Sequence, residues 1–355
     1  MRCSTLDFGE LTGPMKKLRV GVVGVGHLGR HHARIFSGMP GVALVGVADS
    51  SAARCAEVAA ACGVPAYEDY RALVSRVDAA SIVVPTSLHF DVAAAFLNAG
   101  KSLLIEKPLT ADVAQANHLV ELAQQRGVTL QVGHIERFNP VLKALPEVGE
   151  PPRLIEARRT GPFSFRSTDI SVVFDLMIHD LDIVLSIVGE MPDQIQAIGW
   201  SEFGGHDDVV HAHLTFPCGT VAHLTASRAD VKPVREMTVR WTQTLAHLDF
   251  AARRTVVCMP KPDFYEAAQF FVNPPVAQIA SLRERLHSDY FQVTETDHSA
   301  GPELLAVELE HFVVCVRDRR EPLVNGPRAR DAVQLATSIL HSAHSESALG
   351  LAKAA

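Results

Sequence analysis

Three side chains could together remove a proton from a hydroxyl group and stabilise the charge left on its oxygen: Lys107, Asp175 and His179. Lys107 follows the apolar run SLLIE, at the expected carboxyl end of a strand, where open α/β sheets bind their ligands. A lysine there could donate a hydrogen bond to a substrate oxygen and stabilise a developing alkoxide. Asp175 and His179 are four residues apart, one helical turn. The carboxylate could therefore orient and charge the imidazole, which would accept the proton.

The segment SVVFDLMIHDLDIVLSIVG predicts that Asp182 shares the helix face of Asp175 and His179, because the spacing is i, i+4 and i+7. Asp180 should point elsewhere, as a surface or capping group. Both patterns have a structural alternative. Lys107 could be a solvated lysine before a helix-starting proline. The acidic residues and His179 could form only the polar stripe of an amphipathic helix.

A second pattern, GVGHLG, places Gly24, Gly26 and Gly29 directly after an apolar strand and before a helix. Glycines at these positions permit a tight turn and let the backbone approach a pyrophosphate at the helix N-terminus. Asp49 ends the next strand, 20 residues after Gly29, where a carboxylate can bind both ribose hydroxyls and repel a 2′-phosphate. This predicts NAD rather than NADP, with Arg54 as the residue that could relax the preference. The alternative is a purely structural glycine turn.

Short apolar runs alternate with helical patterns in the first part of the chain. The runs are LRVGVVG (18–24), VALVGVAD (42–49), AASIVV (79–84), SLLIE (102–106) and TLQVG (129–133). Apolar strands separated by helices predict a doubly wound parallel sheet with both faces covered. We expect this dinucleotide-binding domain to span residues 15–138, after a flexible extension at 1–14.

From residue 139 to 355 the pattern changes to longer strands with period-two alternation, such as VVHAHLTFP and TVAHLTASRA. Such alternation predicts an antiparallel sheet with one packed and one open face. Residues 261–300 are expected to be an irregular excursion, and two helical patterns close the chain. We expect this domain to bind the substrate and to form a homo-oligomer, a dimer or tetramer, through the open sheet face.

Composition excludes several classes of protein. The 355 residues carry a net charge of −7, which argues against a nucleic-acid or membrane partner. No apolar run approaches the ~20 residues that span a bilayer. The six cysteines show no CxxC spacing, which favours a reducing cytoplasm. No metal site is expected, because His211, His213 and His223 have no acidic or cysteine ligand at a recognised spacing.

The ordered set GVGHLG, Asp49, VPTSLHF, AGKSLLIEKPL, VGHIERFNP and DLMIHDLD resembles the glucose–fructose oxidoreductase/inositol dehydrogenase/MocA (Gfo/Idh/MocA) family from Leu18 to about residue 345. The resemblance implies an N-terminal Rossmann domain and a C-terminal α/β domain with a large, mainly antiparallel sheet. It implies that Lys107 contacts the reacting oxygen and that His179, with Asp175, is the acid–base residue. The residues expected to bind NAD are Gly24, Gly26, His27, Leu28, Gly29, Asp49, Pro85, Thr86, His89, Glu106 and Lys107.

Members of that family commonly oxidise a sugar or cyclitol hydroxyl. Here GHIERFNPVLKAL, EARRTGPFSFRSTD and DLMIHDLD look most like bacterial members acting on nucleotide sugars, in particular UDP-N-acetylglucosamine 3-dehydrogenases. Arg137, Arg166 and Asp182 are the expected substrate-binding residues, and Arg158 and Arg159 add positive charge suited to a diphosphate. These arginines could instead be structural. The alternatives for function are an inositol or free-sugar dehydrogenase, an NAD-dependent glycosidase and a non-catalytic NAD sensor.

Overall fold

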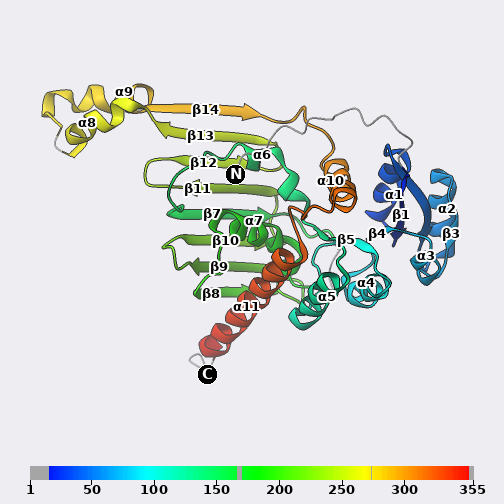
Figure 1. Cartoon of the computed structure of the whole chain (residues 1–355). Coiled ribbons are helices and arrows are strands. Elements are labelled where there is room, and N and C mark those ends of the chain that lie inside the picture. The colour runs from blue at the N-terminus through cyan, green and yellow to red at the C-terminus, as the bar shows by residue number, and fades with distance from the viewer. Residues whose placement is uncertain (1–15, 166–169, 273, 352–355) are drawn as a thin grey trace.

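Two sheets form the framework of the computed structural model, which describes residues 16–165, 170–272 and 274–351 (Figure 1). The extension expected at residues 1–14 lies outside the described residues. The first sheet is parallel throughout, in the order β3-β2-β1-β4-β5-β6. Its strands are β1 (Leu18–Val23), β2 (Val42–Ala48), β3 (Ala66–Tyr67), β4 (Ala79–Ile82), β5 (Ser102–Glu106) and β6 (Leu130–Gly133). The prediction of a doubly wound parallel sheet is confirmed.

Helices connect these strands, because parallel neighbours require a crossover. They are α1 (Gly29–Gly38), α2 (Ala52–Cys62), α3 (Arg71–Val74), α4 (His89–Asn98) and α5 (Val113–Arg126). Local sequence sets the ends of two of them. The side chains of Ser51 and Asp112 accept N-terminal backbone N–H groups of α2 and α5, while Gly63 and Gly127 adopt the left-handed conformation after their last turns.

The second sheet is mixed and mainly antiparallel, in the order β14-β13-β12-β11-β7-β10-β9-β8. Its strands are β7 (Leu154–Thr160), β8 (Gln194–Trp200), β9 (Val209–Thr215), β10 (Val221–Ser227), β11 (Val234–Arg240), β12 (Leu245–Asp249), β13 (Arg254–Pro260) and β14 (Phe291–Asp297). Only β7 and β10 pair in parallel among the described strands of this sheet. Burial alternates along β7 and β10, as predicted for a sheet with one packed face.

The second half also contains helices. They are α6 (Pro140–Lys143), a π-helical turn (Val173–Met177) that leads into α7 (Ile178–Val188), α8 (Pro262–Val272), α9 (Ile279–Tyr290), α10 (Leu304–Asp318) and α11 (Gly326–Leu351). Of these, α7, the π-helical turn before it and α11 pack on the sheet. Within the described ranges, no helix is long and apolar enough to cross a bilayer.

The expectation of an irregular excursion at 261–300 is wrong. Helices α8 and α9 occupy this segment, and β14 returns to pair with β13. They extend beyond the sheet as an arm (Figure 1). Pro262 is the first residue of α8, a position where proline is favoured because its missing N–H would have no helical partner. A proline interpreted as a sign of irregular chain therefore marks the start of a helix.

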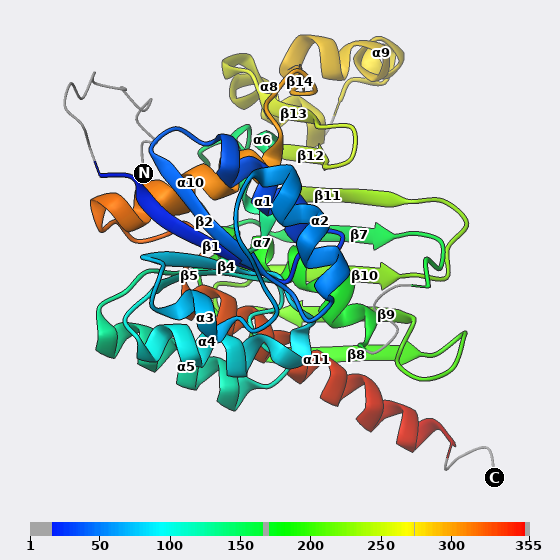
Figure 2. The same cartoon turned by 90° about the vertical axis from the view of Figure 1, so that its right-hand side faces the viewer.

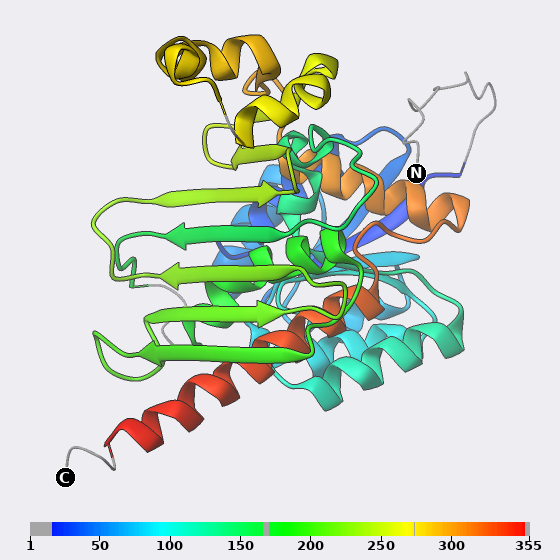
Figure 3. The same cartoon turned by 90° about the vertical axis from the view of Figure 1, so that its left-hand side faces the viewer.

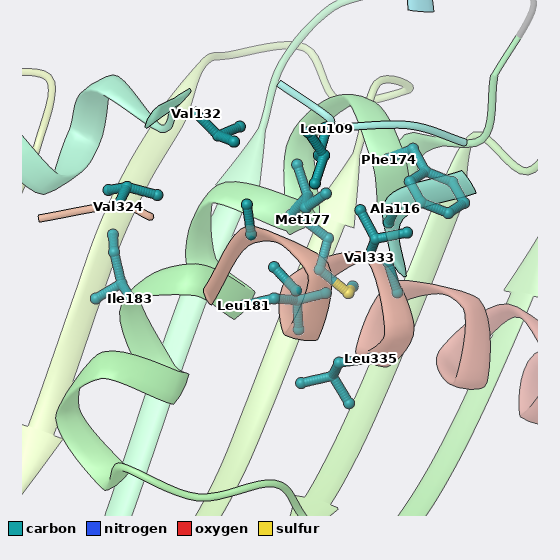
Figure 4. Packing of buried hydrophobic residues seen from close by; sticks show 14 of the residues in the cluster. Leu109, Ala116, Val132, Phe174, Met177, Leu181, Ile183, Val324, Val333 and Leu335 are labelled. Atoms are coloured by element: carbon teal, nitrogen blue, oxygen red, sulfur yellow. The ribbon is translucent and has the colours of Figure 1, made fainter. Parts of the chain in front are cut away.

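The last two helices return to the first domain. Helix α10 packs against α1, and α11 packs against α5, α7 and β8 (Figure 2). Leu309, Phe312 and Val313 of α10 share a buried cluster with Val20 and Phe36 of the first domain. In a second cluster, Leu109 and Val132 lie with Met177 and Leu181 of the π-turn and α7, and with Val333 of α11 (Figure 4). Helix α7 is therefore packed rigidly between the two sheets.

Candidate active site

The carboxyl ends of the central parallel strands meet at one edge of the first sheet. Glu106 pairs with Gly133, so the residues after them, Lys107 and His134, leave neighbouring strands side by side. A cleft of about 800 Å³ lies along this edge. Ten of the predicted NAD-binding residues line it: Gly24, Gly26, His27, Leu28, Asp49, Pro85, Thr86, His89, Glu106 and Lys107. Asp175 from the π-turn also lines the cleft.

The glycine turn fits a dinucleotide. A Cβ on Gly24, whose φ is +85°, would lie 2.5 Å from the carbonyl oxygen of Val83, and one on Gly29 would collide with the carbonyl oxygen of Gly24. A Cβ on Gly26 would meet no protein atom within 4 Å. Packing therefore accounts for Gly24 and Gly29, whereas Gly26 leaves open the space that a pyrophosphate needs beside the helix N-terminus.

Asp49 is fixed at the end of β2 in the position of a ribose-binding carboxylate. It accepts hydrogen bonds from the backbone N–H groups of Val25 and Ser51, both at 2.8 Å, and pairs with Arg54 at 2.7 Å. Burial opposes ionisation of the carboxyl, but these donors outweigh it and hold the pKa of Asp49 below its ordinary value. A permanently charged carboxylate suits NAD, and the Arg54 guanidinium lies directly against it.

Lys107 is largely buried and reaches across the cleft to the π-turn. Its Nζ lies 2.6 Å from the carbonyl oxygen and 3.4 Å from a carboxylate oxygen of Asp175. Burial lowers the pKa of Lys107, although Asp175 and Glu106 oppose that shift. His89 holds the loop after Lys107, with its ring nitrogens 2.8 Å and 2.9 Å from the carbonyl oxygens of Pro108 and Val84. The ammonium is thus positioned to donate toward the cleft.

His179 lies on the first turn of α7, beyond Lys107. Burial, reinforced by the charges of Lys107 and Arg159, lowers its pKa well below the ordinary value. Its Nδ1 is sealed from solvent and has no hydrogen-bond partner among the described residues. A neutral imidazole beside a lysine ammonium can accept a hydroxyl proton while the lysine stabilises the oxygen.

The expected contact between Asp175 and His179 does not form. Asp175 lies in the π-helical turn, whose wider winding differs from the regular helix on which the spacing argument relied. Its carboxylate contacts Lys107 instead. The carboxylate of Asp175 is therefore paired with the ammonium of Lys107 and not with the imidazole.

A further expectation, about Asp180 of α7, is wrong. Asp180 is buried, not a surface or capping group, and pairs with Arg159 of β7 at 2.8 Å. Arg159 also pairs with Glu136 at 2.9 Å, so it is a structural ion and not a free phosphate ligand. Asp182, predicted to share a helix face with Asp175 and His179, is buried as well.

Arg137 and Asp182 neutralise each other at 3.4 Å, with side chains 9% and 2% exposed. The pair lies outside the cleft-lining set, which counts against the predicted substrate-binding role of both residues. Arg158 projects from the other face of β7 and lies 3.7 Å from Asp230. Arg166 lies outside the described residues. The arginine cluster expected to bind a diphosphate is therefore not assembled from Arg137, Arg158 and Arg159.

Sequence reasoning missed two residues near His179. His134, the first residue after β6, is buried, and its ring lies edge-on to that of His179 with centroids 6.1 Å apart. His134 follows a predicted strand directly, as Lys107 does, and this position in the sequence could have identified it. Arg235 of β11 pairs in register with Arg159, so both side chains project from the packed face of the sheet. Unlike Arg159, Arg235 is exposed.

Comparison with known proteins identifies the family. Residues 18–134 match the oxidoreductase family with an NAD-binding Rossmann fold, and residues 152–244 match the GFO/IDH/MocA C-terminal domain. The chain belongs to the Gfo/Idh/MocA family. The predictions of the family, of an enzyme and of NAD as its cofactor are therefore confirmed.

The individual relatives include dehydrogenases of a nucleotide sugar and of an inositol. A UDP-N-acetylglucosamine 3-dehydrogenase from Acidithiobacillus ferrooxidans is 44% identical over 237 residues, 66% of this chain and 75% of the relative. A solved structure of that enzyme has a TM-score of 0.80 at 35% identity, covering 93% of this chain and 99% of the other. A scyllo-inositol 2-dehydrogenase (NAD(+)) from Bacillus subtilis is 25% identical over 87% of this chain and 89% of the relative. The prediction of an NAD-dependent sugar dehydrogenase is confirmed at this level.

The shifted pKa values of His179 and Lys107 predict the pH profile of kcat/KM. A lowered histidine pKa keeps the base neutral into more acidic solution, so activity should persist below about pH 6.5, the ordinary histidine value. Because its pKa is lowered, Lys107 loses its proton at a lower pH than an ordinary lysine. The decline of kcat/KM at alkaline pH should therefore begin below about pH 10.4.

The measurement is kcat/KM for sugar oxidation against pH, in the wild type and in Lys107→Arg. The guanidinium keeps its proton throughout, so the alkaline limb should disappear in the variant even if the rate drops. An unchanged limb would show that another group produces it.

Proposed function

We propose that this protein oxidises a hydroxyl group of a nucleotide sugar to a ketone, as a UDP-N-acetylglucosamine 3-dehydrogenase does. The observation that carries the proposal is the contact of Lys107 with Asp175, at a cleft lined by the residues predicted to bind NAD and close to the buried ring of His179. The likeness to an enzyme of that name, over most of both chains, supports the choice of substrate.

In the proposed reaction, the sugar hydroxyl lies between Lys107 and His179. Lys107, held by Asp175, donates a hydrogen bond to the reacting oxygen and stabilises its negative charge as the proton leaves. His179 accepts that proton at Nε2, since its Nδ1 faces the sealed interior. Bound NAD supplies the acceptor for the hydride. A general base typically contributes about 10²–10⁴-fold to such a rate.

We assign the diphosphate of the substrate to Arg235. The described residues give this guanidinium no ion-pair partner, while Arg137 and Arg159 are committed to buried carboxylates. Arg235 projects from the same sheet face as Arg159 and is close enough to His179 to oppose protonation of its ring. An accessible arginine beside the base suits a phosphate, which it can bind through two parallel hydrogen bonds.

Purified protein incubated with NAD and UDP-N-acetylglucosamine should produce NADH, followed by its absorbance. Free N-acetylglucosamine, glucose and myo-inositol serve as matched controls without a diphosphate. Turnover of inositol or glucose without turnover of the UDP sugar would overturn the substrate assignment. Cleavage of a glycoside with no net NADH would instead indicate an NAD-dependent glycosidase, and NAD binding without turnover of any sugar would indicate a sensor.

Replacing Arg235 by Ala should raise KM for the UDP sugar at least about tenfold, because a charged hydrogen bond contributes roughly 1.5–3 kcal/mol. The KM for NAD should stay within about twofold. Arg240→Ala is the control, since Arg240 lies on the same strand but on the opposite sheet face, beside Glu156. Equal effects of the two substitutions would contradict the assignment.

We further propose that the open face of the second sheet pairs with another copy of the chain, as a dimer or tetramer. Among the described helices, none lies in front of β7, β10 and β11 (Figure 3). Ile198 and Trp200, two residues apart on β8, are 52% and 42% exposed, whereas Ala197, which precedes them and faces the other side of the strand, is buried. Exposed apolar side chains on an open sheet are typical of a subunit interface.

Light scattering should give the mass of a dimer or tetramer for the wild type and a smaller mass for Ile198→Glu, because a charge would be buried at the interface. Leu323→Glu, an exposed leucine between α10 and α11, should leave the mass unchanged. A wild type with the mass of one chain at micromolar concentration would refute the pairing.

A further inference from the structure

Two neighbouring histidines beside the cleft have ring nitrogens without partners. Both ring nitrogens of His134, and Nδ1 of His179, are sealed from solvent and form no hydrogen bond within the described ranges. Their rings meet edge to face with centroids 6.1 Å apart. Buried polar groups without partners are uncommon, because desolvating them is costly. Two adjacent imidazoles with buried, unpartnered ring nitrogens, close to the residues proposed to react with the sugar, call for a functional explanation.

The backbone fixes the ring of His134 at this place. Residue 134 directly follows β6, and its N–H donates to the carbonyl oxygen of Val132 at 2.9 Å. Its own carbonyl oxygen accepts the N–H of Arg137 at 3.0 Å, which begins the short helical segment Ile135–Phe138. The ring is therefore held against His179 by a rigid turn at the same sheet edge that presents Lys107.

The surroundings of His179 disfavour the protonated form that a base must adopt. Burial and the charges of Lys107, Arg159 and Arg235 all disfavour the imidazolium form. Asp175, which could have compensated, is paired with Lys107. A proton accepted at Nε2 is therefore poorly retained unless the ring gives up another proton at Nδ1, so that it stays neutral throughout.

We infer that His134 is the next proton carrier in the reaction and acts through His179, without touching the substrate. The inference rests on the proposed sugar oxidation. The C–H bond breaks and its hydride, with both electrons, goes to the nicotinamide. The hydroxyl proton goes to Nε2 of His179, while the Nδ1 proton of His179 passes to a ring nitrogen of His134. The edge-to-face contact of the two rings, with centroids 6.1 Å apart, makes His134 the neighbouring imidazole to which this proton can pass.

The surroundings of His134 act on the transferred proton in both directions. Burial lowers the pKa of His134, and Lys107 and Arg137 act in the same direction. Asp182 of α7 favours the protonated ring, and Glu106 at the end of β5 does so more weakly. Asp182 is also paired with Arg137 at 3.4 Å, so the carboxylate is shared between Arg137 and the ring of His134. Asp182, which sequence reasoning assigned to the substrate, is in this scheme the counter-ion of the relay.

The test compares His134→Phe and His134→Gln with the wild type. Both variants should lower kcat by about 10²-fold or more and leave KM for NAD and sugar within about twofold, because the relay acts on the proton and not on binding. Glutamine can form hydrogen bonds but cannot carry the proton, so recovery of kcat in His134→Gln would overturn the relay. His311→Phe is the control, a half-buried histidine that packs on Phe138 away from the cleft.

Kinetics in mixtures of light and heavy water give a readout that a purely structural role would not change. A plot of kcat against the deuterium fraction of the solvent should be curved in the wild type, since two protons move. The same plot should be a straight line in His134→Phe, where only one proton moves. Identical curves, or a kcat of His134→Phe within about twofold of the wild type, would overturn the inference.

Nitrogen-15 NMR of the histidine rings, with no sugar present, tests the pair independently of turnover. We expect the proton of neutral His179 on Nδ1 in the wild type and a mixture of the two tautomers in His134→Phe. The same tautomer in both proteins would count against the relay. If the wild type oxidised no sugar, the proposed function would fail, whereas this measurement would still report on the two rings. Thermal unfolding of each variant verifies that it is folded.

Discussion

Arg159 donates hydrogen bonds to Asp180 and Glu136 in a region that solvent does not reach, and the three charges come from three separate parts of the chain. Arg159 belongs to the second sheet, Asp180 to α7, and Glu136 to the segment that follows the last strand of the first sheet. Removing one member would leave an uncompensated buried charge, which typically costs about 3–5 kcal/mol. The contact therefore fixes α7 between the sheets, and with it the distance from His179 to Lys107.

The same arrangement determines the surroundings of His179, the proposed base. Each acidic group near His179 is committed to a cation, Asp180 to Arg159 and Asp175 to Lys107, so none of them charges the imidazole directly. His179 is left in a buried and predominantly cationic environment that favours the neutral ring. A neutral base beside an ammonium is an arrangement suited to removing a proton from a hydroxyl whose oxygen becomes negative.

Local patterns were sufficient for much of this structure and insufficient for the rest. Apolar runs separated by helices predicted the parallel sheet, and the glycine spacing with Asp49 predicted the cofactor turn, because both depend on neighbouring residues. The position of Lys107 followed from its place after a strand, and His134 could have been found by the same rule. The pairing of Asp180 with Arg159 could not, since it depends on which strand lies beneath α7. The π-turn that redirects Asp175 has no local signature that would have revealed it.

Helices α10 and α11 lie last in the chain yet complete the core of the first domain, where Phe312 packs among residues of β1 and α1. The dinucleotide-binding half therefore does not build its core from one continuous segment of the chain. A piece cut at residue 138 would lack the two helices that complete that core. A fragment ending there would expose the apolar surfaces that these helices cover. During synthesis, the first domain gains its full core only after the second sheet has been made. The cofactor cleft and the residues proposed to act on the sugar therefore rest on packing that the two ends of the chain build together.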